Sequence, residues 1–121
     1  MEEIIQRSDT IASDRIEGTA IFDTSGGRIG HVTKLMIDKT SGKVTDAIIS
    51  VGGFLGLGGE YHSLPWEKLD YDSTLHGYRL DVTEEQLRDA PRFVEADEAR
   101  LYDKDYRSSV YEYWAVTPYW Y

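Results

Sequence analysis

The sequence predicts a mainly β protein: a small six-stranded barrel, then a short helix and an aromatic-rich C-terminal tail. Six short strand-like segments lie between residues 18 and 82, and their connections have the lengths of hairpin turns. No helical pattern long enough to cover a sheet face occurs before residue 83. A sheet without covering helices must close on itself to bury one face of each strand, so a small barrel is expected.

The first three strands are predicted in the order in which they occur. "GTAIFD" (18–23) and "RIGHVTKLMID" (28–38) form a hairpin around "TSGG", whose glycines can take positive φ. "KTSG" turns the chain again, and "KVTDAIISV" (43–51) alternates between two faces. We expect the face with Ala47, Ile49 and Val51 to point inward.

The second half of the barrel follows a glycine-rich loop. "EYHSLPW" (60–66) is extended because Pro65 disfavours helical backbone for the residue before it. "KLDYD" (68–72) and "GYRLDV" (77–82) are two more alternating strands. Thr83 and Gln86 then have the spacing of a capping box, which predicts a short helix that runs to about Ala90 and ends at Pro91.

Composition excludes several classes of function. The 121 residues carry 22 acidic and 13 basic side chains, a formal charge of −9, and the basic residues do not cluster, so nucleic acid is not an expected partner. The chain has no cysteine, which excludes thiolate metal sites and cysteine nucleophiles. Its first residues are acidic without an apolar run, and no stretch approaches the roughly 20 apolar residues of a membrane span. We therefore expect a cytoplasmic protein without direct membrane contact.

The stretch "VGGFLGLGGEYHSLPWEKL" (51–69) raises the question of a phosphate-binding loop. Such a loop needs a helix after it and a cation at its end, but an extended segment follows and Glu60 occupies that position. The favoured interpretation is structural: the glycines bend the connection while Phe54, Leu55 and Leu57 fold over an open barrel end. An exposed flap that docks another protein remains the main alternative.

No catalytic or metal-binding constellation is evident. His31, His62 and His76 lie in different segments without carboxylates at ligand spacing. Neither Ser50 nor Ser63 lies in a nucleophile elbow. We expect no enzyme activity, no metal and no cofactor.

The C-terminal tail has the strongest claim to function. Eight of the fifteen aromatic residues lie in the last twenty positions. Tyrosine and tryptophan offer large contact areas at low entropic cost and are enriched at interfaces. Two arrangements stay open: the tail packs on its own barrel, or it forms an interface, most simply with a second copy of the chain.

Three segments resemble the PRC-barrel family, which includes the cytoplasmic part of the photosynthetic reaction centre H subunit and the C-terminal half of the ribosome maturation factor RimM. They are "SDRIEGTAIFDTSGGRIGHVTKLMID" (13–38), "AIISVGGFLGLGGEYHSLPWEKL" (47–69) and "TEEQLRDAPRF" (83–93). The second is similar to the stand-alone bacterial members. We expect no counterpart of the H subunit's membrane helix or of RimM's additional barrel, and therefore no direct role in a photosystem or in ribosome maturation. The resemblance implies a six-stranded barrel that acts as an adaptor or assembly module without a cofactor.

These expectations divide the chain into an N-terminal extension (1–8), a PRC-barrel domain (9–93) and an aromatic-rich tail (94–121). The predicted function is a non-enzymatic protein-interaction module, a homo-oligomer and most simply a dimer, with an unknown further protein partner. The alternative is a small-ligand binder that uses the glycine loop and barrel end, with His62 or Glu60 as a polar contact. The candidate interaction residues are Phe54, Leu55, Leu57, Trp66, Tyr111, Tyr113, Trp114, Tyr119, Trp120 and Tyr121.

Overall fold

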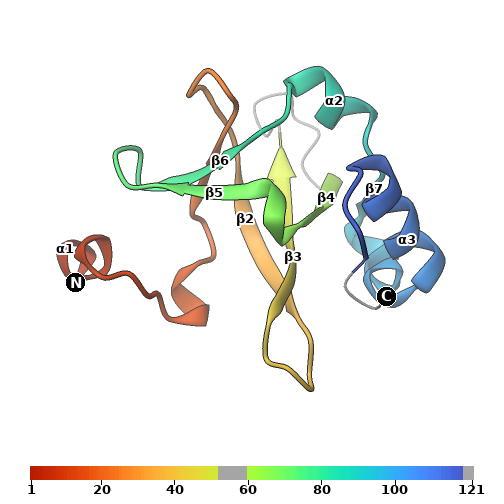
Figure 1. The fold of residues 1–121 in the computed structure, drawn as a ribbon, viewed down its shortest axis with the longest axis horizontal. Coiled ribbons are helices and arrows are strands. Elements are labelled where there is room, and N and C mark those ends of the chain that lie inside the picture. Colours follow the sequence, from red (N-terminus) through yellow and green to blue (C-terminus); the bar gives the residue numbers. More distant parts are fainter. Residues whose placement is uncertain (52–59, 119–121) are drawn as a thin grey trace.

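The fold is a single seven-stranded sheet with helices at its two ends, seen in a computed structural model that describes residues 1–51 and 60–118 (Figure 1). The strand order is β5-β6-β1-β2-β3-β4-β7. All six predicted strands are present, and the mainly β class with a short helix is confirmed. Their bounds are β1 (Ala20–Phe22), β2 (Arg28–Ile37), β3 (Val44–Val51), β4 (Glu60–Pro65), β5 (Leu69–Asp72) and β6 (Gly77–Leu80).

Two aspartates build the first two hairpin turns. Asp23 Oδ1 accepts hydrogen bonds from the backbone N–H of Ser25 at 3.0 Å and of Gly27 at 2.9 Å, and Gly26 has φ +89°. In the next turn Asp38 Oδ1 accepts from the N–H groups of Thr40 and Ser41. An aspartate that satisfies the amides two or more residues ahead stabilises a tight turn, so the chain reverses at both predicted positions.

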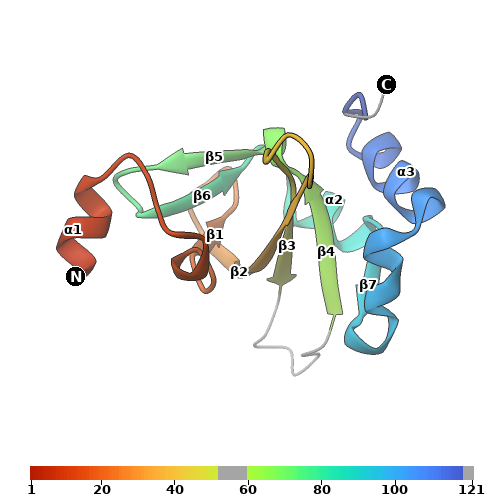
Figure 2. The same cartoon turned by 90° about the horizontal axis from the view of Figure 1, so that it is seen from below.

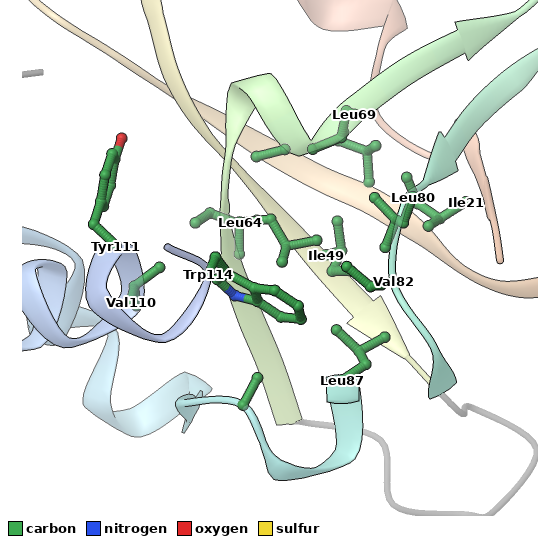
Figure 3. Close-up of a cluster of buried hydrophobic side chains, with 14 of the residues drawn as sticks. Ile21, Ile49, Leu64, Leu69, Leu80, Val82, Leu87, Val110, Tyr111 and Trp114 are labelled. Carbon is green, nitrogen blue, oxygen red and sulfur yellow. The ribbon is translucent and has the colours of Figure 1, made fainter. Parts of the chain in front are cut away.

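The sheet departs from the prediction in strand number and in closure. A seventh strand, β7 (Arg92–Val94), pairs with β4, and the described strands show no pairing between the end strands β5 and β7. The predicted six-stranded closed barrel is therefore an open, curled sheet (Figure 2). Side chains from outside the sheet, including Leu87 and Trp114, join the buried cluster, so the concave face is filled without strand closure (Figure 3).

A parallel pairing connects the β5–β6 hairpin to the rest of the sheet. β6 lies beside β1 through the pairs Ile21↔Tyr78 and Phe22↔Arg79. The approach is close at Gly77, where an added Cβ would lie 2.5 Å from the Ala20 carbonyl oxygen. Glycine is required there because any larger residue would push β6 away from β1.

Strand β3 is buried on both faces, not on one. Ala47 and Ile49 are fully buried as predicted, whereas Val51 is only partly buried. Ile48, on the opposite face, is also buried. The tail covers part of this second face, because Tyr111 contacts Asp46, which lies on the same side of β3 as Ile48. The alternating pattern of β3 therefore does not mark a face exposed to solvent.

The predicted capping box is confirmed at α2 (Glu84–Asp89). Thr83 Oγ1 accepts from the N–H of Gln86 at 3.0 Å, and the Gln86 side chain accepts from the N–H of Thr83 at 2.8 Å. This reciprocal pair satisfies two backbone donors at the helix start. The cap positions Leu87, which is buried in the core.

The tail packs on its own sheet over residues 95–118. It forms the 3-10 segment η4 (Glu95–Tyr102) and the helix α3 (Lys104–Tyr113), which lies beside β4 and β7 in both views of the fold (Figures 1 and 2). In Figure 3 the Trp114 ring points into the same cluster as Leu64 and Leu87. The structure thus favours the first of the two arrangements left open above. The tail residues buried in the core are Leu101, Tyr106, Val110, Tyr111 and Trp114.

A buried polar contact joins α3 to β3. Tyr111 Oη lies 3.0 Å from the Thr45 carbonyl oxygen and 3.2 Å from Asp46 Oδ1. Asp46 is 3% exposed, and Ser63 Oγ lies 3.5 Å from its Oδ2. Burial raises the pKa of the Asp46 carboxyl, although hydrogen bonds from Thr45 and Tyr111 oppose this change.

Candidate interaction surface

An exposed row of aromatic side chains extends from the core towards the β5–β6 turn. Trp66 and Tyr78 have ring centroids 5.4 Å apart, and Tyr71 and Tyr78 are 5.3 Å apart, both in edge-to-face arrangements. Tyr71 and Tyr78 are direct cross-strand partners, on the same face as the buried pair Leu69 and Leu80. The apolar face of this hairpin therefore continues past the core as an aromatic row (Trp66, Tyr78 and Tyr71).

The row is only partly covered. Tyr71 is 51% exposed, whereas Tyr78 and Trp66 are half-buried. Desolvation raises the pKa of the Tyr78 hydroxyl, and the neighbouring Tyr71 raises it further, so Tyr78 stays neutral at physiological pH. The row thus presents amphipathic rings, the type of surface that proteins use for contacts with other proteins.

A cleft of about 720 Å³ lies between this row and the N-terminal segment. The helix α1 (Glu2–Arg7) forms part of its wall, and Figures 1 and 2 both show α1 set apart from the sheet beside the β5–β6 hairpin. The apolar and aromatic lining comes from Ile5, Ile11, Tyr71 and Tyr78. The charged lining has both signs, from Glu2, Arg7, Asp9, Arg15 and Glu17, with His76 beside them.

The β5–β6 hairpin that carries the row is fixed by its turn. Asp72 Oδ1 accepts from the N–H groups of Thr74 at 2.9 Å and Leu75 at 3.0 Å, and its Oδ2 lies 3.2 Å from Arg79 Nη2. These contacts lower the pKa of Asp72, the Leu75 backbone N–H having the largest effect. The turn therefore holds the hairpin in one shape while the row stays open.

Strand β5 adds to the same region an edge that pairs with none of the other described strands. It pairs with β6 on one side and is the last strand in the sheet order. An edge strand presents backbone N–H and C=O groups that another extended chain can pair with. The surface at this end of the molecule therefore combines an aromatic row, a cleft and an open strand edge.

The structure places the sequence-predicted candidates in three different environments. Trp66 lies in the aromatic row. Tyr111 and Trp114 are 3% and 5% exposed and belong to the chain's own core. Tyr113 is partly exposed, and its hydroxyl donates a hydrogen bond to the Gln86 carbonyl oxygen. The remaining candidates, Phe54, Leu55, Leu57, Tyr119, Trp120 and Tyr121, lie outside the described residues.

The polar residues of the alternative ligand site do not face this cleft. Glu60 pairs with Arg92 at 3.5 Å. His62 is buried, and desolvation lowers its pKa to about 4, so the imidazole is neutral at physiological pH. Neither residue lines the cleft beside α1.

Sequence reasoning missed Tyr71, Tyr78 and the helix α1. A signal for the tyrosines was present, because each lies two residues from a core leucine of its strand and so shares that leucine's face. Helix α1 has six residues, too few for a clear helical period.

The described residues contain neither a candidate metal site nor a candidate membrane-spanning helix. Residues 1–51 and 60–118 contain no group of three or more histidine or acidic side chains that could hold a metal ion. The same part of the chain has no helix of the length and apolarity that a membrane crossing requires.

The family is shown by a comparison of the whole sequence. The family model of the PRC-barrel domain matches residues 8–87, which is well over half of the chain. No curated protein matches the sequence. The matched range contains six of the seven strands and most of α2. The chain therefore belongs to the PRC-barrel domain family.

Proposed function

We propose that this protein is a non-enzymatic assembly module that associates with a second copy of itself through the end of the molecule that carries the aromatic row. PRC-barrel domains are generally non-catalytic modules, which supports the first half of the proposal. The proposed self-association depends on one observation. Exposed large apolar side chains gather at this end: Met1 is 72% exposed, Ile4 67%, Tyr71 51% and Ile11 39%.

Tyr71 packs against Tyr78, but Met1 and Ile4 bury little of their surface in the single chain. Helix α1 has no buried residue; Ile4 lies within it and Met1 is its N-cap. A helix of six residues is marginal in water without packing against another surface. Exposed apolar clusters of this kind are typical of contact sites between proteins.

The edge of β5 supports the same location. A second chain that adds a strand there would pair its backbone groups with an edge that no other described strand occupies. Tyr71, in the middle of this strand, would then be partly covered. A cofactor, a metal or a nucleic acid has no part in this proposal.

The test is the mass of the full-length protein in solution over a wide concentration range. Sedimentation velocity should show a concentration-dependent dimer, and Tyr71→Ser should weaken it by about tenfold or more, as for a central aromatic contact residue. Tyr102→Ser is the matched control because Tyr102 is 74% exposed on η4, away from this end. A protein that stays monomeric at all concentrations would contradict the proposal, as would equal effects of the two variants.

A further inference from the structure

We infer that in the dimer each copy places the outer face of its α1 in the cleft of the other copy, against the aromatic row. This inference depends on the proposed self-association and names the contact that produces it. Three features carry it: the apolar pattern of α1, the position of the cleft on the same end of the molecule, and the mixed charge of the cleft lining.

The first feature is the division of apolar residues on α1. Met1, Ile4 and Ile5 follow the i, i+3, i+4 spacing of one apolar stripe along a helix, and the successive residues Ile4 and Ile5 form its two edges, about 100° apart. Ile5 lines the chain's own cleft, whereas Met1 and Ile4 do not line it and are largely exposed. Helix α1 thus holds its position through Ile5 and presents Met1 and Ile4 outward, where another surface is needed to bury them.

The second feature is that the projecting element and the cleft lie on the same end of the molecule. A two-fold interface uses one surface patch on both subunits, so that patch must be complementary to itself. Here a projecting helix with exposed Met1 and Ile4 lies next to a cleft that the exposed Tyr71 ring helps to line. Rotation by a two-fold axis between the copies would place each helix opposite the other copy's cleft.

The third feature is electrostatic. The chain as a whole carries a formal charge of −9, and a uniformly acidic patch would repel its own copy. The cleft lining instead brings Arg7 and Arg15 together with Glu2, Asp9 and Glu17. Glu3, exposed in the first turn of α1, would meet these arginines in a second copy. A patch of mixed sign fits a second copy better than a strongly basic or strongly acidic partner.

The test uses cysteine pairs, because the chain contains no cysteine of its own. Ile4→Cys is mixed with Ser73→Cys, which lies in the cleft lining, and one of the two carries an affinity tag. Ser41→Cys replaces Ser73→Cys in the control, because Ser41 is exposed in the β2–β3 turn and is not part of this cleft. Mild oxidation should link the Ile4→Cys chain to the Ser73→Cys chain at least tenfold more efficiently than to the Ser41→Cys chain.

A second measurement separates this inference from the proposed function. Ile4→Glu, which alters an exposed side chain, should weaken the dimer by at least tenfold in sedimentation velocity, while Ile37→Glu at the exposed end of β2 should leave it unchanged. A dimer that resists Ile4→Glu but is weakened by Tyr71→Ser would overturn the α1 contact and leave self-association intact. Equal oxidation of the cleft and control pairs would also overturn the contact. A monomeric wild type would overturn both.

Discussion

Tyr111 on α3 and Asp46 on β3 meet in the interior, with Tyr111 Oη 3.2 Å from Asp46 Oδ1 and 3.0 Å from the Thr45 carbonyl oxygen. A phenol has one proton, so Tyr111 can donate to only one of these acceptors at a time. If the Asp46 carboxyl takes up a proton, it can donate to Tyr111 Oη while Tyr111 donates to Thr45. Burial raises the pKa of Asp46 and so favours the protonated form that this chain of hydrogen bonds needs.

Removal of the Tyr111 hydroxyl should destabilise the protein without moving α3. Tyr111→Phe leaves buried acceptors without this donor, which costs about 1–3 kcal/mol of unfolding free energy. Urea unfolding followed by tryptophan fluorescence measures the loss. Tyr102→Phe is the control, since Tyr102 is exposed and should give no change. Equal stability of the two variants would show that the contact contributes nothing.

Asp46→Asn should change the dependence of stability on pH. Because the pKa of Asp46 is raised in the folded state, folding disfavours its ionised form. The folded protein then binds more protons than the unfolded chain. The contribution of this carboxyl to the free energy of unfolding therefore falls as pH rises from its unfolded pKa of 3.8 through its higher folded pKa. Asparagine does not titrate, so the variant should gain stability relative to wild type across that window.

Asp38→Asn is the opposite case and serves as the comparison for Asp46→Asn. The Ser41 backbone N–H has the largest part in lowering the pKa of Asp38, so its ionised form is favoured by folding. Asp38 therefore stabilises the fold above pH 3.8, and this stabilisation is lost as pH falls through the lowered pKa of the folded state. The two variants should therefore differ from wild type with opposite slopes in urea unfolding at a series of pH values; parallel slopes would contradict the assignment.

Loss of the α2 cap should cost about 1 kcal/mol, the usual value for a helix N-cap. Thr83→Ala removes the acceptor for the Gln86 N–H, whereas Thr83→Ser keeps a hydroxyl at the same position. Thermal unfolding should show a lowered midpoint for Thr83→Ala and a midpoint near wild type for Thr83→Ser. Similar midpoints for both variants would mean that the cap is not significant for stability.

The tail should be indispensable for folding. Trp114→Ala should cost about 3–5 kcal/mol because it empties a large volume in the core. Trp114→Phe should be milder, since it keeps most of the apolar volume and removes an indole N–H that has no hydrogen-bond partner among the described residues. Truncation after Phe93 should abolish cooperative unfolding in circular dichroism, because it removes several core residues. A stable truncated protein would contradict the tail's place in the core.

The sequence predicted what depends on local pattern and missed what depends on distant contacts. The turn at "TSGG", the alternation of β5 and β6 and the Thr83–Gln86 cap each follow from neighbouring residues, and each is confirmed. The pairing of β1 with β6 joins residues far apart in sequence, and no local signal reports it.

The candidate surface was predictable to a smaller extent. Aromatic content alone does not separate Trp114, which fills the core, from Tyr71, which is exposed. The difference arises from how far the apolar face of each element extends beyond the packed interior. β7 has three residues and Asp46 is an acid within an apolar strand, so neither has a pattern that predicts its final position.

The short parallel junction between β1 and β6 has a consequence for local unfolding. The β5–β6 hairpin joins the sheet at Ile21↔Tyr78 and Phe22↔Arg79, whereas β2 and β3 pair along nearly their whole lengths. Few backbone pairs need to break for the hairpin to separate as a unit. Amide hydrogen exchange should therefore divide the sheet into two cooperative units, with β5 and β6 losing protection well before β2 and β3.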